Sequence, residues 1–292
     1  MNYRHAYHAG NFADVVKHAV LALVIEHAKK KPAPFRIIDT HAGTGRYDLS
    51  AEQAGKTGEW QGGIGRLLAE PLPEDIAAIL APYLAAVAAE NPGREGAELA
   101  SYPGSPLIAR HLMRAADQLV VNELHPEDCA QLEELLIRDR QTKILSIDGW
   151  AALKSLVPPK ERRGIVLVDP PFEVAGELAR MVQGLRDGLR RFATGTFILW
   201  YPIKELRAIE AFRHEVASLG LEKVLDVELL VREAGGAGLA GSGLLVVNPP
   251  FTLAGTLEQL LPFLASRLAQ GPGAGSRVTW LAPERAGAGR DR

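Results

Sequence analysis

Several features that define whole classes of protein are scarce in this sequence. Its 292 residues include one cysteine, Cys129, so no disulfide can form within the chain. No apolar run reaches the roughly 18 residues of a membrane-spanning helix. The opening segment, MNYRHAYHAG, lacks the apolar core of a secretory signal. These absences predict a globular protein of the cytoplasm without a membrane partner.

An excess of positive charge is also absent. The chain carries 33 Lys and Arg against 35 Asp and Glu, for a net charge of −2. This balance excludes a protein that binds nucleic acid over its whole surface, so a nucleic-acid partner would have to contact a local basic patch. Cations available for such a patch are Arg4, Arg46, Lys154, Lys160, Arg162 and Arg163. The last three fit a solvated loop equally well.

Short apolar runs alternate with helical patterns along most of the chain. Because the runs are largely apolar throughout, they are typical of a parallel sheet covered on both faces, and the alternation predicts an α/β, doubly wound fold. A Gly-rich, non-helical stretch joins the last two runs and favours an antiparallel pair. Strands are predicted at 34–40, 118–124, 142–148, 164–171, 196–202, 222–231 and 243–250, with helices at 126–138, 174–192 and 204–219.

Two regions stand outside this alternation. A helix is predicted from about Phe12 to Lys30, with Asn11 as its N-cap and Asp14 placed as in a capping box. Residues 47–100 show no strand pattern, and 72–89 are rich in Ala and Leu. We therefore expect 47–100 to be a helical insertion after the first strand. Residues 1–46 and 101–285 would form the main domain, and 286–292 a disordered tail.

Polar residues follow the first three predicted strands of this sheet. The loop after the first strand, Asp39 to Gly45, contains Gly43, whose lack of a side chain lets backbone approach a ligand. A dinucleotide-binding GxGxxG pattern would require glycine where Asp48 stands, which weakens an NAD interpretation. An acidic residue followed by GxG resembles the first motif of class I S-adenosylmethionine-dependent methyltransferases, although a plain strand–helix turn fits equally well.

The next two strands each end in a carboxylate. Glu123 follows the second strand and suits the two hydroxyls of a ribose. Asp148, before Gly149, could accept a hydrogen bond from the exocyclic amine of an adenine. The alternatives are an exposed strand-end carboxylate for the first and a simple Asp-Gly turn for the second.

The fourth strand end carries Asp169-Pro170-Pro171-Phe172. Two prolines stiffen this loop, and the Pro170 carbonyl and the Asp169 carboxylate form a pair of acceptors that fits a planar NH₂ group. Phe172 could stack on the base that carries it. The pattern [DN]-P-P-[YFW] marks methyltransferases that act on such nitrogens. A second match, Asn248 to Phe251, comes late in the chain, and we interpret it as a turn after the final strand.

Segments along nearly the whole chain, Asn2 to about Glu284, resemble one family. The chain is identified as a member of the ribosomal RNA large subunit methyltransferase J family, the 23S rRNA adenine-N6 methyltransferases. The segments that carry this resemblance are Tyr3 to His18, Asp39 to Tyr47, Tyr102 to Pro106, Glu123 to Pro126, Asp169 to Glu173, Arg191 to Gly195 and Leu199 to Pro202.

The resemblance implies a class I methyltransferase fold, S-adenosylmethionine as the methyl donor and an adenine of 23S rRNA as the acceptor. It implies a catalytic role for Asp169, with Pro170 and Phe172 beside it, although tyrosine is common at the position of Phe172. Tyr3, Arg4 and Phe172 are expected at the substrate. Cofactor contacts are expected from Lys17, His18, His41, Gly43, Ser105, Glu123, Asp148, Gly149 and Asp169.

Three other classes of protein remain open on sequence grounds. A DNA adenine methyltransferase would share the four strand-end motifs. A protein-glutamine methyltransferase usually begins its motif with Asn, whereas Asp169 begins this one. A non-catalytic RNA-binding protein would need only a basic surface. We expect no metal, because CxxC and HExxH patterns are absent. The rRNA should be protein-free or in early assembly intermediates, because a buried adenine cannot enter a pocket.

Overall fold

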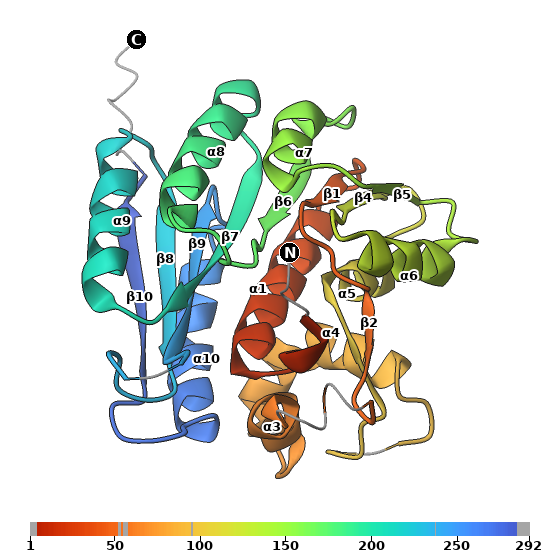
Figure 1. Cartoon of the computed structure of the whole chain (residues 1–292), viewed down its shortest axis with the longest axis vertical. Helices are drawn as coiled ribbons and strands as arrows, with labels where there is room; N and C mark the ends of the chain where they lie inside the picture. The colour runs from red at the N-terminus through yellow and green to blue at the C-terminus, as the bar shows by residue number, and fades with distance from the viewer. Residues whose placement is uncertain (1–4, 52–53, 55–57, 95, 237, 285–292) are drawn as a thin grey trace.

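The computed structural model of the chain describes residues 5–51, 54, 58–94, 96–236 and 238–284, and its centre is an eight-stranded sheet (Figure 1). The strand order is β10-β8-β9-β7-β6-β1-β4-β5. The strands are β1 (Arg36–Asp39), β4 (Gln118–Asn122), β5 (Thr142–Leu145), β6 (Gly164–Val168), β7 (Thr196–Ile203), β8 (Val224–Leu230), β9 (Gly241–Val247) and β10 (Gly275–Ala282).

Every strand predicted from an apolar run is present, and the expected antiparallel pair is β8 with β9. β9 also pairs antiparallel with β7, whereas β1, β4, β5, β6 and β7 run parallel. The prediction that β9 is the final strand was wrong. After it come α10 (Leu253–Arg267) and β10, which pairs antiparallel with β8 at the sheet edge. β10 has no fully buried residue, so it lacks the apolar run that marks the central strands.

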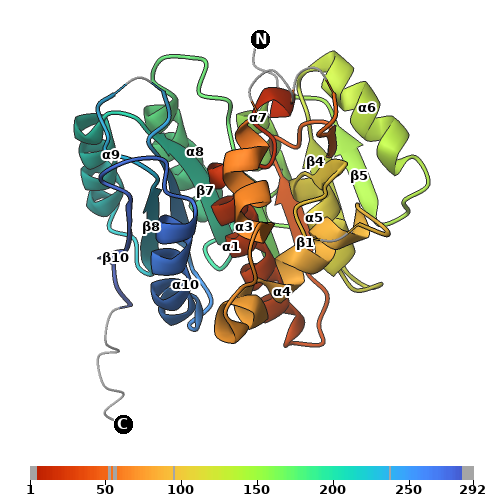
Figure 2. The ribbon, with the colours of Figure 1, turned by 90° about the horizontal axis from the view of Figure 1, so that it is seen from below.

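Helices cover both faces of the sheet, as the apolar strands predict. Along β1, Ile37 joins one buried cluster and Ile38 the other, because successive side chains of a strand point to opposite faces. One face holds α1 (Phe12–Lys29), α5 (Ser105–Leu112), α6 (Pro126–Leu136) and α10; the other holds α7 (Gly149–Leu156), α8 (Glu177–Arg191) and α9 (Leu206–Ser218). In Figure 2, β8 lies between α9 and α10.

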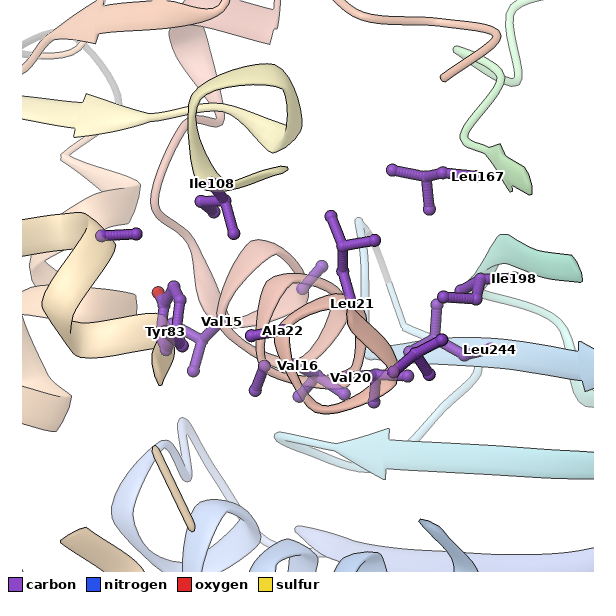
Figure 3. Packing of buried hydrophobic residues seen from close by; sticks show 14 of the residues in the cluster. Val15, Val16, Val20, Leu21, Ala22, Tyr83, Ile108, Leu167, Ile198 and Leu244 are labelled. Atoms are coloured by element: carbon purple, nitrogen blue, oxygen red, sulfur yellow. The ribbon is translucent and has the colours of Figure 1, made fainter. Parts of the chain in front are cut away.

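Helix α1 is the centre of the larger cluster. Figure 3 shows its side chains between Leu167, Ile198 and Leu244 of the sheet and Tyr83 and Ile108 of other helices. Asn11 caps this helix as predicted, because its side chain accepts hydrogen bonds from the N–H groups of Ala13 and Asp14. The predicted capping box is wrong in detail: the Asp14 carboxylate accepts from Gly10 N at 2.9 Å.

Residues 47–100, predicted as a helical insertion, contain three helical elements, but two short strands enclose them. β2 (Arg46–Asp48) and β3 (Ser101–Pro103) pair antiparallel, which corrects the expectation of no strand there. They are three residues long, too short to show a periodic pattern. Between them lie η2 (Gln61–Gly65), α3 (Arg66–Leu68) and α4 (Glu74–Ala89). Asn91 closes the insertion, because its side-chain oxygen accepts from Ala100 N and Ser101 N.

The insertion packs directly on the main domain. Leu80, Tyr83 and Val87 of α4 belong to the same buried cluster as the apolar side chains of α1, so the insertion has no separate core. A short 3-10 turn, η1 (His5–Tyr7), precedes α1. None of the helices in the described residues combines the length and apolar character needed to cross a membrane.

Candidate active site

Four parallel strands end at the same edge of the sheet, and their ends line a cavity of about 330 Å³. Ligands of open α/β sheets bind at this edge. The structure brings ten residues expected from the sequence to this cavity: Lys17, His18, His41, Gly43, Ser105, Glu123, Asp148, Gly149, Asp169 and Pro170. Tyr3 and Arg4 lie outside the described residues.

The glycine loop after β1 is held in place by Glu123. Gly43 has a φ of +61°, and a Cβ there would lie 2.1 Å from Tyr47 Oη, so only glycine fits. Gly43 N donates to Glu123 Oε2 at 2.8 Å, and His125 N donates to Oε1 at 2.7 Å. Burial raises the pKa of the Glu123 carboxyl, whereas these two donors lower it. A carboxylate has about four acceptor sites, so two remain for the hydroxyls of a ligand.

Asp39, at the end of β1, was not assigned a role from the sequence, yet it anchors two predicted site residues. It accepts hydrogen bonds from Ser105 Oγ at 2.6 Å and from His41 N at 3.3 Å. Burial raises the pKa of Asp39 to about 6. Burial also lowers the pKa of His41 to about 4, so the imidazole is neutral at pH 7. A Cβ at Gly149 would lie 2.3 Å from His41 Nε2, which explains the glycine.

The end of β5 leads into α7, and Asp148 caps that helix. Its Oδ1 accepts from Trp150 N at 3.1 Å and from Ala151 N at 3.0 Å. Asp148 thus has the turn-forming role that the sequence left open. The other carboxylate oxygen of Asp148, Oδ2, lies 3.6 Å from Arg180 Nη2.

Trp150 forms a flat wall of the cavity, a feature that sequence reasoning missed. Its Nε1 donates to Glu177 at 3.0 Å, and the Arg180 guanidinium lies 5.9 Å from its ring centroid. Room for the ring comes from Gly184, where a Cβ would lie 2.4 Å from the indole. No local pattern marks these residues, because α8 meets α7 only in the folded chain.

Asp169 at the end of β6 forms an ion pair with Lys17 of α1. The Lys17 Nζ lies 2.5 Å from Asp169 Oδ2 and 2.7 Å from Asp14 Oδ1. Burial alone would lower the pKa of Lys17, but the two carboxylates raise it above its usual range, so the amine is charged. Asp14 also contacts His5, whose Nε2 lies 2.9 Å from Oδ2. Asp14 thus has a site role as well as its role at the start of α1.

His18 connects the cavity to the insertion. The side chain is 1% exposed, and its Nδ1 lies 2.7 Å from Tyr102 Oη, which is 3.0 Å from Tyr83 Oη. Burial lowers the pKa of His18 to about 3, so this imidazole is neutral. Because Tyr83 belongs to α4, the insertion supports the floor of the site.

Phe172 is not among the residues that line the cavity. It follows the two prolines with a φ of +52°, and its ring packs edge-on against Trp200 with the centroids 5.6 Å apart. Its stacking on a substrate base therefore stays a prediction, and its contact with Trp200 depends on tertiary packing.

The second sequence match to this motif lies at the opposite edge of the sheet. Because β9 runs antiparallel to β7, Asn248 emerges where β7 begins. Its Nδ2 donates to the carbonyls of Ala193 and Gly195, both at 2.8 Å. Asn248 therefore shapes a turn, as predicted, and takes no part in the site. Within the described residues, no group of three or more His, Cys, Asp or Glu could hold a metal ion.

The strand order β5-β4-β1-β6-β7-β9-β8, with β9 reversed between parallel neighbours and a cavity at the carboxyl ends of the strands, defines a class I methyltransferase fold. The family model described as "Ribosomal RNA large subunit methyltransferase D, RlmJ" matches residues 32–282, and the chain belongs to this family.

Similar proteins agree with this assignment over nearly the whole chain. The chain is 41% identical to "Ribosomal RNA large subunit methyltransferase J" of Escherichia coli over 97% of its length and all of that protein. It is also 41% identical to the protein of that name in Haemophilus influenzae, with the same coverage. A crystal structure of a Legionella pneumophila protein has a TM-score of 0.83 and 29% identity, covering 94% of this chain and 98% of that one.

Proposed function

We propose that this protein transfers the methyl group of S-adenosylmethionine to N6 of a specific adenine in 23S rRNA. The observation that carries the proposal is the Asp169-Pro170-Pro171 loop at the end of β6, opening on a cavity with carboxylates at neighbouring strand ends. Two relatives at 41% identity carry the name of a large subunit rRNA methyltransferase. The proposed site of action is the cytoplasm, on RNA that is protein-free or in early assembly.

The cavity suits a cofactor that combines a nucleoside with a sulfonium cation. Carboxylates of Glu123, Asp148 and Asp169 line it, and Trp150 offers a flat apolar wall. We propose that Glu123 receives the ribose hydroxyls with its remaining acceptor sites. When bound, S-adenosylmethionine supplies an electrophilic methyl group with a neutral thioether as the leaving group.

Asp169 is proposed to bind the target amine. Its Oδ2 holds the Lys17 ammonium, and Oδ1 has no hydrogen-bond donor within the described part of the chain. Oδ1 and the Pro170 carbonyl can each accept one hydrogen of the adenine N6 amine. Accepting both favours a more tetrahedral nitrogen, whose lone pair then points away from the ring. Lys17 fixes the carboxylate in position, so the acceptors are oriented before the base arrives.

The decisive experiment is methyl transfer from labelled S-adenosylmethionine to three substrates: protein-free 23S rRNA, assembled large subunits and DNA. Product nucleosides are identified by mass spectrometry. We expect N6-methyladenine in protein-free rRNA. Asp169→Ala should reduce the rate at least about a hundredfold, since it removes a positioning acceptor at the reacting nitrogen, while circular dichroism stays unchanged. Equal or faster methylation of DNA would replace the RNA assignment with a DNA one.

A further inference from the structure

The charges of this chain separate onto opposite edges of the sheet. Six carboxylates line the active-site cavity, from Glu123, Asp128, Asp148, Asp169, Glu173 and Glu177, against the cations Lys17 and Arg180. Lys17 is only 4% exposed and already paired with two carboxylates. Such a lining attracts a sulfonium cofactor but repels phosphate, so affinity for a large RNA must come from another surface.

The opposite edge has the reverse charge. It consists of the turns before the parallel strands and the turn after β9: residues 30–35, 113–117, 137–141, 157–163, 190–195, 219–223 and 248–252. We call it the far edge. It carries four acidic residues, Asp117, Asp139, Glu161 and Glu222. Its eleven cations are Lys30, Lys31, Arg114, Arg138, Arg140, Lys160, Arg162, Arg163, Arg190, Arg191 and Lys223.

Most of this positive charge is uncompensated. Asp117, Asp139 and Glu161 are each bound by an arginine, Arg114, Arg110 and Arg36 respectively. Nine of the eleven far-edge cations have no ion pair with any described residue; the two that do are Arg114 and Lys223. The far edge is therefore a positive surface on a protein whose net charge is −2.

An exposed aromatic ring stands on the same edge. Phe251 is 86% exposed, and its ring meets His27 edge-on with the centroids 5.5 Å apart. Lys30 and Lys31 lie close enough to His27 to lower the pKa of its imidazole, in addition to the effect of burial. Arg163 also lies near the C-terminal end of α1, because its guanidinium donates to the Ala28 and Ala33 carbonyls.

The turn that presents Phe251 is firmly held. Asn248 donates from Nδ2 to the Ala193 and Gly195 carbonyls, and its own carbonyl accepts from Thr196 Oγ1 at 2.9 Å. Its backbone N–H donates to the Lys223 carbonyl at 2.9 Å. Two prolines follow before Phe251. The second sequence motif therefore builds a rigid support for a solvent-facing ring.

We infer that the far edge is a second RNA-binding surface, with Phe251 stacking on an unpaired base and the surrounding cations binding phosphates. Exposed aromatic rings beside lysines and arginines are the combination that single-stranded RNA binds. Helix α1 joins the two edges (Figure 1), and Lys17 and Lys30 are separated by about 20 Å at 1.5 Å per helical residue. A large rRNA can reach both, with one segment at the cavity and another at the far edge.

This inference rests on the rRNA substrate of the proposed function, and its test is designed to separate the two. The patch variant is Lys30→Gln, Lys31→Gln and Lys160→Gln, all exposed residues without a described ion pair. The matched control is Arg94→Gln, Lys143→Gln and Arg207→Gln, which removes the same charge from exposed positions outside the far edge. The third variant is Phe251→Ala.

Two measurements are made with each protein. Binding to a long protein-free 23S rRNA transcript is followed as a function of salt. Methylation kinetics are measured on that transcript and on the smallest fragment that the wild type still methylates. The patch variant should flatten the slope of log affinity against log salt by about two, from three phosphate contacts at near 0.7 each on a single strand. Phe251→Ala should weaken binding about tenfold with little change in slope. The kcat on the small fragment and the affinity for S-adenosylmethionine should stay at wild-type values.

Each other outcome overturns the inference. Wild-type slope and affinity in the patch variant would mean that the far edge binds no RNA. An equal loss in the control would mean that only net charge matters. Failure of the wild type to methylate any RNA would instead refute the proposed function, whatever the binding data.

Discussion

At the scale of single residues, Asp39 links the site to the pH dependence of stability. Burial raises its pKa to about 6, against about 3.9 in an unfolded chain. The folded protein thus holds this proton more tightly, and the stability gained is present below about pH 4 and lost as the pH rises to about 6.

We predict that Asp39→Asn removes this loss of stability at higher pH, because asparagine does not titrate. The asparagine side chain still offers an acceptor for Ser105. Relative to the wild type, the variant should gain about 3 kcal/mol of unfolding free energy between pH 4 and pH 7, from a shift of roughly two pKa units. Urea titrations at both pH values measure this change. If the difference in unfolding free energy between the variant and the wild type is the same at both pH values, the pKa of Asp39 is not raised.

Glu123 is the residue on which the proposed cofactor site most directly depends. Its carboxylate accepts from Gly43 N and His125 N, and the residue lines the cavity with two acceptor sites left for a ligand. Glu123→Gln keeps the shape but converts one oxygen into a donor. We predict that S-adenosylmethionine binds about 1–3 kcal/mol more weakly, the range for a charge-assisted hydrogen bond. Calorimetric titration gives the affinity, and NAD serves as the negative control. Unchanged affinity in the variant would remove Glu123 from the cofactor site.

At the scale of elements, the turn after β9 shows how one motif can serve two purposes. Asn248 has a φ of +53° and three polar contacts through its side chain and carbonyl, all at the far edge. We predict that Asn248→Ala lowers the free energy of unfolding by about 1–3 kcal/mol, since two hydrogen bonds worth about 0.5–1.5 kcal/mol each are lost, but leaves kcat on the small RNA fragment unchanged. Thermal unfolding and initial rates test both parts. A loss of kcat in a fully folded variant would give Asn248 a catalytic role.

Strand β9 can pack closely against Tyr201 because residue 243 is a glycine. A Cβ at Gly243 would lie 2.1 Å from the ring of Tyr201, which is fully buried and donates to Asp226 at 2.5 Å. We predict that Gly243→Ala destabilises the protein by about 1–3 kcal/mol through overpacking.

Gly255→Ala provides the matched control, because Gly255 is exposed within α10 and has open space around it. It should stabilise the protein by up to about 1 kcal/mol, the helix propensity difference. Denaturant midpoints compare the two variants. Similar effects of both substitutions would mean that β9 and Tyr201 can move apart.

At the scale of the whole molecule, the insertion and the main domain share one core. The apolar side chains of α4 pack with those of α1, and Tyr83 and Tyr102 extend this contact to His18 below the cavity. We therefore predict one cooperative unfolding transition in urea, with tryptophan fluorescence and far-ultraviolet circular dichroism giving the same midpoint. Separate midpoints would show that the insertion unfolds alone. Tyr83→Phe, which removes only the hydroxyl, should lower the common midpoint without splitting it.

Most of the elements, and the strand ends that carry the candidate site, could be predicted from the order of the amino acids. Apolar runs predict the central strands because a buried parallel strand needs apolar residues on both faces. Asp169, Glu123, Gly43 and Asp148 were found because carboxyl ends of parallel strands meet at one edge, so position along the chain is enough to place them. The short strands β2 and β3 and the half-exposed β10 gave no such signal.

Contacts between side chains that are distant along the chain could not be predicted, because they form only in the folded molecule. The ion pair of Lys17 with Asp169 joins residues 152 positions apart, and the contact of Trp150 with Glu177 joins two helices. No local pattern encodes such contacts, because they depend on how α1 and α8 pack on the sheet. The same holds for the separation of charge between the two edges. Lysines and arginines scattered through six turns become one surface only when the sheet aligns the turns that precede its strands.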